Sequence, residues 1–167
     1  GEITFESKNY KLALGHFSTL ENVGVTQEDL SLAKRGQMYC FYNLDNYQST
    51  LIYAKKVLAL NQISEKVSED ANLYLANSYK ELNFLDSAML HYENVIATTK
   101  SEAAAEAKYN ICHIYFLRED YATCETQIME LVQQKPTYDY WLAKGILLLG
   151  DNFTQLKDYF NARHSLQ

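Results

Sequence analysis

This sequence contains few residues that would interrupt a helix. Proline occurs once and glycine six times in 167 residues. Sandwiches of short strands need many more turn residues, so this scarcity favours long helices. Apolar residues make up 47% of the chain, enough to bury a core. No run of 18 apolar residues is present, so we expect no segment of this chain to insert into a membrane.

Clustered positive charge is also lacking. Fifteen Lys and Arg residues are scattered among 21 Asp and Glu residues, and the formal net charge is −6. Binding a phosphate backbone needs clustered basic side chains, so nucleic acid is not an expected partner. No basic segment followed by an apolar stretch opens the sequence, so no signal peptide is visible. Because Gly1 is not a natural initiator, we expect the chain to be a fragment of a longer protein.

A repeat of 36 to 38 residues runs through the sequence, and a period of this length decides the fold. A shift of 36 matches Leu75 with Ile111, Ala76 with Cys112, Tyr79 with Tyr115, Leu85 with Tyr121, Ala88 with Cys124, Tyr92 with Ile128 and Val95 with Leu131. Shifts of 38 extend the pattern forwards to Leu149, Gly150, Phe153, Tyr159, Ala162 and Leu166, and backwards to Phe41, Tyr47, Thr50 and Val57. Small residues let two antiparallel helices approach closely, and large residues fill the space between neighbouring pairs. One pair cannot bury its apolar stripe alone, so stacking is expected to complete the core.

At these residues the chain resembles the tetratricopeptide repeat (TPR) family. The segment Leu149-Gly150-Asp151-Asn152-Phe153 is similar to the first half of the family pattern, and the segment from Asp86 to Tyr92 to the second half. Pro136 stands where the family's proline closes a repeat. The family's tryptophan position is filled instead by Lys34, Asn72, Lys108 and Ile146. The resemblance implies an all-α solenoid of antiparallel helix-turn-helix repeats wound into a right-handed superhelix.

The repeat pattern predicts one array over residues 1–167. It has a partial repeat at 1–26, full repeats at 27–63, 64–100 and 101–136, and a truncated repeat at 137–167. Helices are predicted near 8–22, 27–44, 48–61, 65–82, 85–99, 102–117, 121–134, 138–156 and 159–167, with a remnant of a partner helix at 1–6. Helix-start residues precede four of them: Thr26, Ser64, Ser101 and Thr137. Both ends are expected to be cut from a longer array.

The resemblance also implies a partner-binding surface, because the first helix of each pair lines the concave face of a TPR array. Mapped copy by copy, the central positions are Arg35, Tyr39, Tyr42, Asn77, Lys80, Tyr109, His113 and Phe116. Further positions are Asn43, Leu73 and Glu81 on the same helices, and Leu147, Asp151 and Thr154 on the first helix of the last copy. The aromatic residues recur at intervals of three or four, so each set shares a helix face. The alternative is that these aromatic side chains pack against the next helix, and the pattern alone leaves both interpretations open.

Residues that could support chemistry are few. Gly-rich phosphate loops and a nucleophile elbow are absent from the sequence, and no cofactor or metal is expected. Cys112 and Cys124 occupy the paired small positions of one repeat and are predicted to touch, either as buried thiols or as a disulfide. Two thiolates alone do not complete a tetrahedral metal site. Trp141, beside Tyr138 and Tyr140, either braces the preceding repeat or anchors a partner.

The predicted function is a non-enzymatic scaffold that binds a partner protein or peptide on its concave face. The alternative is an architectural spacer segment of a larger solenoid, without a groove of its own. A contiguous exposed apolar patch would favour binding, and a uniformly polar face would favour the spacer. Degenerate repeats rich in Tyr and Asn look similar to bacterial cell-envelope TPR proteins, so a periplasmic or envelope-associated parent is expected slightly ahead of a cytoplasmic one.

Overall fold

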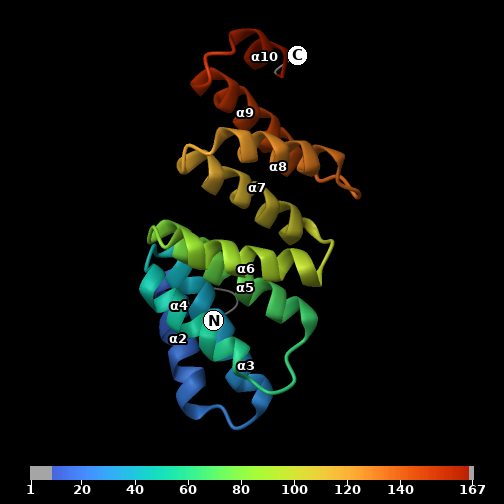
Figure 1. Ribbon diagram of the computed structural model, residues 1–167. Helices are drawn as coiled ribbons and strands as arrows, with labels where there is room; N and C mark the ends of the chain where they lie inside the picture. The colour runs from blue at the N-terminus through green and yellow to red at the C-terminus, as the bar shows by residue number, and fades with distance from the viewer. Residues whose placement is uncertain (1–8, 166–167) are drawn as a thin grey trace. The chain divides into compact units, whose positions relative to one another are not determined.

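A computed structural model describes residues 9–165, which form nine helices and no strand (Figure 1). The helices are α2 (Tyr10–Val23), α3 (Gln27–Asn43), α4 (Tyr47–Leu58), α5 (Glu65–Glu81), α6 (Leu85–Thr98), α7 (Glu102–Leu117), α8 (Tyr121–Gln133), α9 (Asp139–Gln155) and α10 (Tyr159–His164). The predicted all-α fold is confirmed, and each predicted helix has a counterpart. The remnant predicted at 1–6 lies outside the described residues. Within the described part, no helix is both long and apolar enough to cross a membrane.

The chain divides into two compact units, Gly1–His91 and Tyr92–Gln167, and α6 spans the boundary between them. In the first unit, α3 packs against α2 and α4, and α5 packs against α4 and α3. In the second unit, α8 packs against α7 and α9, α9 also contacts α7, and α10 packs against α9. Within each unit, these helices therefore pack against their sequence neighbours, which is the arrangement expected for stacked hairpins. The repeat boundaries and the right-handed superhelix stay predictions.

One turn geometry joins the first and second helix of each hairpin, which are α3 and α4, α5 and α6, α7 and α8, and α9 and α10. The residue after the helix C-cap has a positive φ in each case: 56° at Asp45, 63° at Asn83, 61° at Glu119 and 60° at Lys157. The next amide then donates to the carbonyl five residues earlier, with N–O distances of 2.9 Å for Asn46 to Phe41, 2.8 Å for Phe84 to Tyr79, 3.0 Å for Asp120 to Tyr115 and 2.9 Å for Asp158 to Phe153. This is the Schellman arrangement. Its acceptors are the aromatic residues that mark the repeat.

Side-chain caps begin three of the four helices for which they were predicted. Thr26 forms a capping box, because its Oγ1 accepts from the Asp29 amide at 3.0 Å and the Asp29 carboxylate accepts from the Thr26 amide at 3.1 Å. Ser64 and Ser101 also cap the helices that follow them. The cap predicted at Thr137 is wrong. The N-cap of α9 is Tyr138, whose hydroxyl donates to the Lys100 carbonyl at 2.9 Å, and this anchor starts the helix one residue later.

Small residues are buried where the pattern places them. Ala76 and Ala88 are fully buried. Cys112 and Cys124 share one core cluster with Ile128, Leu149 and Phe153, among other residues, so the predicted pairing of the two cysteines is supported. Both thiols are free and at most 1% exposed. Of the two interpretations left open for this pair, the structure therefore contains buried thiols that act as small apolar residues.

The turn residues with positive φ allow the turn geometry to be tested through the stability of the protein. Glu119→Gly is expected to raise the free energy of unfolding by about 1 kcal/mol, because glycine adopts positive φ without the strain that a Cβ introduces. Urea unfolding measures the change as a shift in the midpoint. Asn83→Gly serves as the control and should gain less, because asparagine tolerates the left-handed region better than glutamate does. A lower midpoint for Glu119→Gly would contradict the assigned turn geometry.

Candidate functional site

The eight predicted partner-binding residues all lie on α3, α5 and α7, the first helices of three hairpins, and each residue is half-buried. Arg35, Tyr39 and Tyr42 lie on α3, Asn77 and Lys80 on α5, and Tyr109, His113 and Phe116 on α7. Among the further predicted positions, Leu73 is half-buried and Asn43, Glu81, Leu147, Asp151 and Thr154 are exposed. The predicted surface is therefore partly covered by neighbouring side chains and partly open.

In the first unit, tyrosine side chains fill the space between α3 and α5. Tyr74 of α5 makes edge-on contacts with Tyr39 and Tyr42, with ring centroids 5.0 Å and 4.8 Å apart. The Tyr39 hydroxyl donates to Asp70 Oδ2 at 2.8 Å. Burial and then the nearby Asp70 carboxylate raise the pKa of Tyr39 to about 12. Much of this aromatic area therefore holds α5 against α3, as the packing interpretation expects.

A charged row on α5 adjoins these tyrosines and was not predicted. Lys66 Nζ lies 3.1 Å from Asp70 Oδ1 and also pairs with Glu69. The Glu69 side chain is only 7% exposed, whereas that of Lys66 is 67% exposed. In the sequence, Lys66 precedes Glu69 by three residues and Asp70 by four, a spacing that predicts ion pairs along one face of a helix. The row keeps the buried Glu69 carboxylate paired and fixes Asp70 as the acceptor for Tyr39.

In the second unit, an aromatic row lies along α7. The rings of Tyr109 and His113 are stacked, with centroids 6.2 Å apart and planes 8° from parallel. Phe116 continues the row and contacts Tyr121 at the start of α8, with centroids 5.8 Å apart. The structure thus brings together the three residues predicted on α7, and each keeps part of its surface open. We call Tyr109, His113 and Phe116 the α7 row.

Trp141 connects α9 to this row. Its ring lies 5.6 Å from that of Tyr109, which supports the interpretation of Trp141 as a brace. The Lys144 ammonium group lies 4.6 Å from the Tyr109 centroid, 5.0 Å from that of Trp141 and 5.5 Å from that of Tyr140. Such cation–π contacts stabilise the arrangement of the rings. Tyr140 is nevertheless 61% exposed, so the cluster presents an aromatic edge to solvent.

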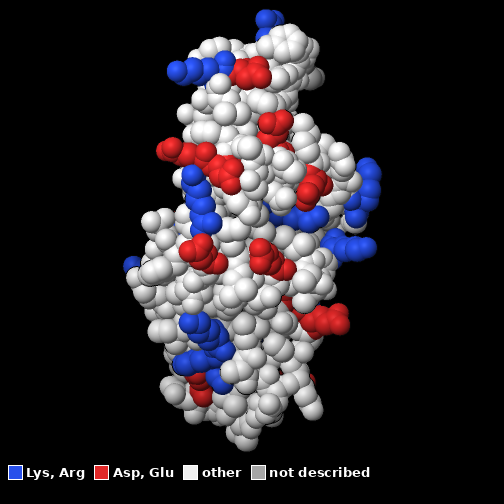
Figure 2. All heavy atoms as spheres, viewed as in Figure 1, with Lys and Arg blue, Asp and Glu red and all other residues white. Residues whose placement is uncertain are grey.

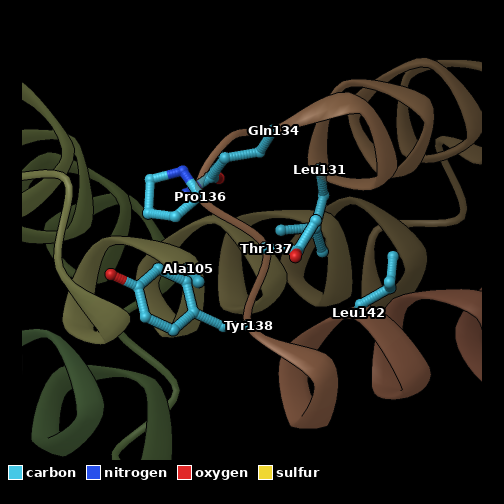
Figure 3. A pocket seen from close by; sticks show the side chains of 7 residues that line it. All are labelled: Ala105, Leu131, Gln134, Pro136, Thr137, Tyr138 and Leu142. Atoms are coloured by element: carbon cyan, nitrogen blue, oxygen red, sulfur yellow. The ribbon is translucent and has the colours of Figure 1, made fainter.

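The described residues of the second unit line a small hollow and a larger one. The smaller lies beside the cis Lys135–Pro136 bond and is lined by Ala105, Leu131, Gln134, Pro136, Thr137, Tyr138 and Leu142 (Figure 3). Its free volume of about 10 Å³ holds a single water at most. Figure 3 shows Tyr138 lying alongside Ala105 of α7. This hollow is therefore a packing feature of the loop before α9 and too small for a ligand.

The larger hollow is an open groove of about 420 Å³ on the α9–α10 hairpin. It is lined by Leu147, Gly150, Asp151, Thr154, Ala162 and Arg163, and we call it the α9–α10 groove. Three of these residues, Leu147, Asp151 and Thr154, are among the further positions predicted to face a partner. The groove combines an apolar wall with one acidic and one basic side chain.

Groups suited to catalysis are sparse among the described residues. Within residues 9–165, no set of three His, Cys, Asp or Glu side chains is grouped so as to hold a metal ion. Burial, and then the neighbouring Cys124, raises the pKa of Cys112 to about 12, and burial raises that of Cys124 to about 11. A thiol nucleophile needs a lowered pKa, so these protonated and inaccessible thiols are unsuited to that role.

Surface charge is mixed on the face that Figure 2 shows. Acidic and basic side chains alternate there, without a broad area of either sign. Recognition of a phosphate backbone depends on a continuous basic surface, and this face does not present one.

A solved structure shares this fold. The crystal structure of YrrB, described as a TPR protein with an unusual peptide-binding site, matches with a TM-score of 0.70 and 13% sequence identity, covering 99% of this chain and 78% of that chain. At this identity the likeness shows the fold alone, and the fold is the TPR type of helical repeat. No protein-family model matches the sequence, and no curated protein matches it.

Alkaline pH is expected to destabilise the fold through Cys112 and Cys124. Both pKa values are raised in the folded state from 9.0, so the unfolded chain loses these protons first. Their contribution to the free energy of unfolding is complete below pH 9 and is lost as the pH rises through the folded values. A Cys112→Ala, Cys124→Ala variant should show a shallower loss of stability than the parent over this range, measured by urea unfolding at several pH values.

Val95→Ala provides the control for that experiment. It removes buried volume in the same unit but no titrating group, so it should lower stability equally at each pH. A double cysteine variant with the same pH dependence as the parent would show that the thiols are not buried as described.

Proposed function

We propose that this chain is a non-enzymatic scaffold that binds a partner protein or peptide through the concave face formed by its first helices. TPR-type repeats are typically scaffolds without catalytic activity, and YrrB is described as having a peptide-binding site. The α7 row is the observation that carries the proposal. Tyr109, His113 and Phe116 lie on one helix face and are held by their neighbours, yet part of each remains accessible.

The packing of the α7 row favours recognition on physical grounds. Side chains that are already fixed lose little conformational entropy when a partner binds. Trp141 and Lys144 hold Tyr109, and Tyr121 holds Phe116. Tyrosine and histidine also combine apolar area with hydrogen-bonding groups, a combination typical of interface residues. The half-buried state of the α7 row therefore fits both interpretations, packing against the next helix and binding a partner. The same rings brace the fold and keep an accessible edge.

The exposed apolar residues of α9 argue against the spacer alternative. A spacer would present a polar face, but Tyr140 is 61% exposed and Leu147 is 57% exposed on the same helix. With a spacing of seven residues, they point to the same side of α9. Exposed apolar area on one helix face is typical of surfaces that bind another chain.

A capture experiment tests the proposal. The protein carrying Tyr109→Ala and Phe116→Ala should retain its partner at least about tenfold more weakly than the unmodified protein, because each aromatic anchor contributes on the order of 1–2 kcal/mol. Captured proteins are quantified by mass spectrometry. Circular dichroism establishes that the variant is folded, since Tyr109 also packs on Trp141.

A matched variant carries Met129→Ala and Leu156→Ala, which remove exposed apolar area from α8 and from the end of α9. These residues lie outside the α7 row, so partner capture should be unchanged. Undiminished capture by the folded Tyr109→Ala, Phe116→Ala variant would exclude the α7 row as the binding surface.

A further inference from the structure

The Lys144 side chain ends among aromatic rings that come from two helices of the second unit. Tyr109 lies on α7, and Tyr140 and Trp141 lie in the first turn of α9. The Lys144 ammonium group is 4.6 Å from the ring centroid of Tyr109, 5.0 Å from that of Trp141 and 5.5 Å from that of Tyr140. At each of these distances a ring face attracts a cation. We call Tyr109, Tyr140 and Trp141 the aromatic cage.

The cation in the cage has no carboxylate partner. Among residues 9–165, no Asp or Glu side chain lies within ion-pair distance of the Lys144 ammonium group. Lys66, by contrast, pairs with two carboxylates of its own helix. Cation–π contacts at accessible sites are individually weak, and the lysine stem is flexible. Lys144 can therefore leave the rings without leaving a carboxylate unpaired.

The aromatic cage is preformed and accessible. Tyr140 is 61% exposed, and Tyr109, Trp141 and Lys144 are half-buried. The ring of Trp141 contacts that of Tyr140 edge-on, with centroids 4.8 Å apart, and lies 5.6 Å from that of Tyr109. These contacts between rings do not involve the lysine, so the cage keeps its shape when Lys144 turns out to solvent. A preformed site loses little conformational entropy on binding.

The charge near the cage favours a cation. Burial, and then the nearby Tyr140, Cys112 and Asp151, raise the pKa of Tyr109, so its phenol is neutral near pH 7. The Asp151 carboxylate adds negative potential at this ring, and the faces of aromatic rings are themselves negative. An anionic ligand would be repelled by both.

A guanidinium group suits this site better than the ammonium group that fills it. An ammonium group is compact and strongly hydrated, whereas guanidinium is planar, weakly hydrated and stacks on aromatic faces. A second ammonium group would replace an identical cation without any gain. An arginine side chain gains the stacking contact and gives up less hydration, while the displaced lysine recovers its own hydration.

We propose that the aromatic cage binds an arginine side chain of the partner protein, and that Lys144 fills the cage in the free chain and leaves it when the arginine enters. The inference rests on the proposed function, because Tyr109 belongs to both the cage and the α7 row. It adds the chemical class of the partner's contact residue and an internal competitor for that residue.

The fluorescence of Trp141 tests this proposal on the full chain, because no other tryptophan is present in the sequence. The chain is titrated with N-acetyl-arginine amide and, as a matched control, with N-acetyl-citrulline amide, which has nearly the same shape without the charge. Sodium chloride keeps the ionic strength constant. The arginine derivative should change the emission saturably and bind at least about fivefold more tightly than the citrulline derivative.

Variants of the chain identify the site of binding. Lys144→Gln removes the competing charge and should bind the arginine derivative about fivefold more tightly than the unmodified chain. Tyr140→Phe keeps the ring and should retain the binding, whereas Tyr140→Leu keeps apolar area without a ring and should weaken it at least about threefold. Because Tyr140 is exposed, both of its variants should stay folded, which circular dichroism establishes.

Several results would overturn the proposal: no saturable response to the arginine derivative, equal binding of the two derivatives, no gain from Lys144→Gln, or undiminished binding by Tyr140→Leu. Tetramethylammonium chloride provides one further titration. Tighter binding of this cation than of the arginine derivative would assign the cage to a methylated ammonium ligand and overturn the arginine assignment.

Partner capture separates this proposal from the scaffold function. Capture that depends on the α7 row but is unchanged in Tyr140→Leu would retain the scaffold function and exclude the cage from partner binding. Saturable, charge-dependent binding of the arginine derivative supports the cage even where the α7 row captures no partner.

Discussion

The helical stack depends on how closely a first helix can approach the helix before it. Gly36 of α3 faces the ring of Phe17 on α2 so closely that an added Cβ would lie 2.4 Å from the ring. Gly145 of α9 meets Leu131 of α8 in the same way. A large side chain on the second helix of one pair thus fills the space that a small residue leaves on the next first helix. Because protein interiors are close-packed, this match of volumes sets the distance between the helices.

The close approach of the helices also determines which side chains the first helices expose on their surface. Contact between Gly145 and Leu131 brings Trp141 to Tyr109, and Lys144 then lies above the same rings. The aromatic residues consequently take part in stacking and in the surface at once. The residues of the α7 row therefore belong to the packed core and to the accessible surface at the same time. Side chains that complete one interface keep an edge available for another.

Much of the fold is predictable from the sequence because small and large residues recur at a fixed period. That period locates the helices and the turns between paired helices. It does not reveal the left-handed conformation, because Asp45, Asn83, Glu119 and Lys157 share no residue type. The N-caps Asn46, Asp120 and Asp158 do share a sequence signal: each is an Asn or Asp directly before a tyrosine that starts a helix.

The candidate site is less predictable than the fold. The family resemblance selects first-helix residues, and the structure places those of α7 in one row. The contacts of Tyr74 with Tyr39 and Tyr42 depend on how α3 and α5 lie side by side, which periodicity within one helix does not encode. The α9–α10 groove likewise arises from two helices whose lining residues differ in type from their repeat equivalents. Predicting such features requires the relative positions of the helices and not only their boundaries.

A comparison of two glycine substitutions tests the account of helix approach most directly. Gly36→Ala should lower the free energy of unfolding by about 1–3 kcal/mol, because the new Cβ collides with Phe17. Gly15→Ala on α2 meets no atom within 4 Å and should raise it by up to about 1 kcal/mol, since alanine is the better helix former. Urea unfolding of both variants gives the two values. A Gly36→Ala protein as stable as the parent would contradict the account.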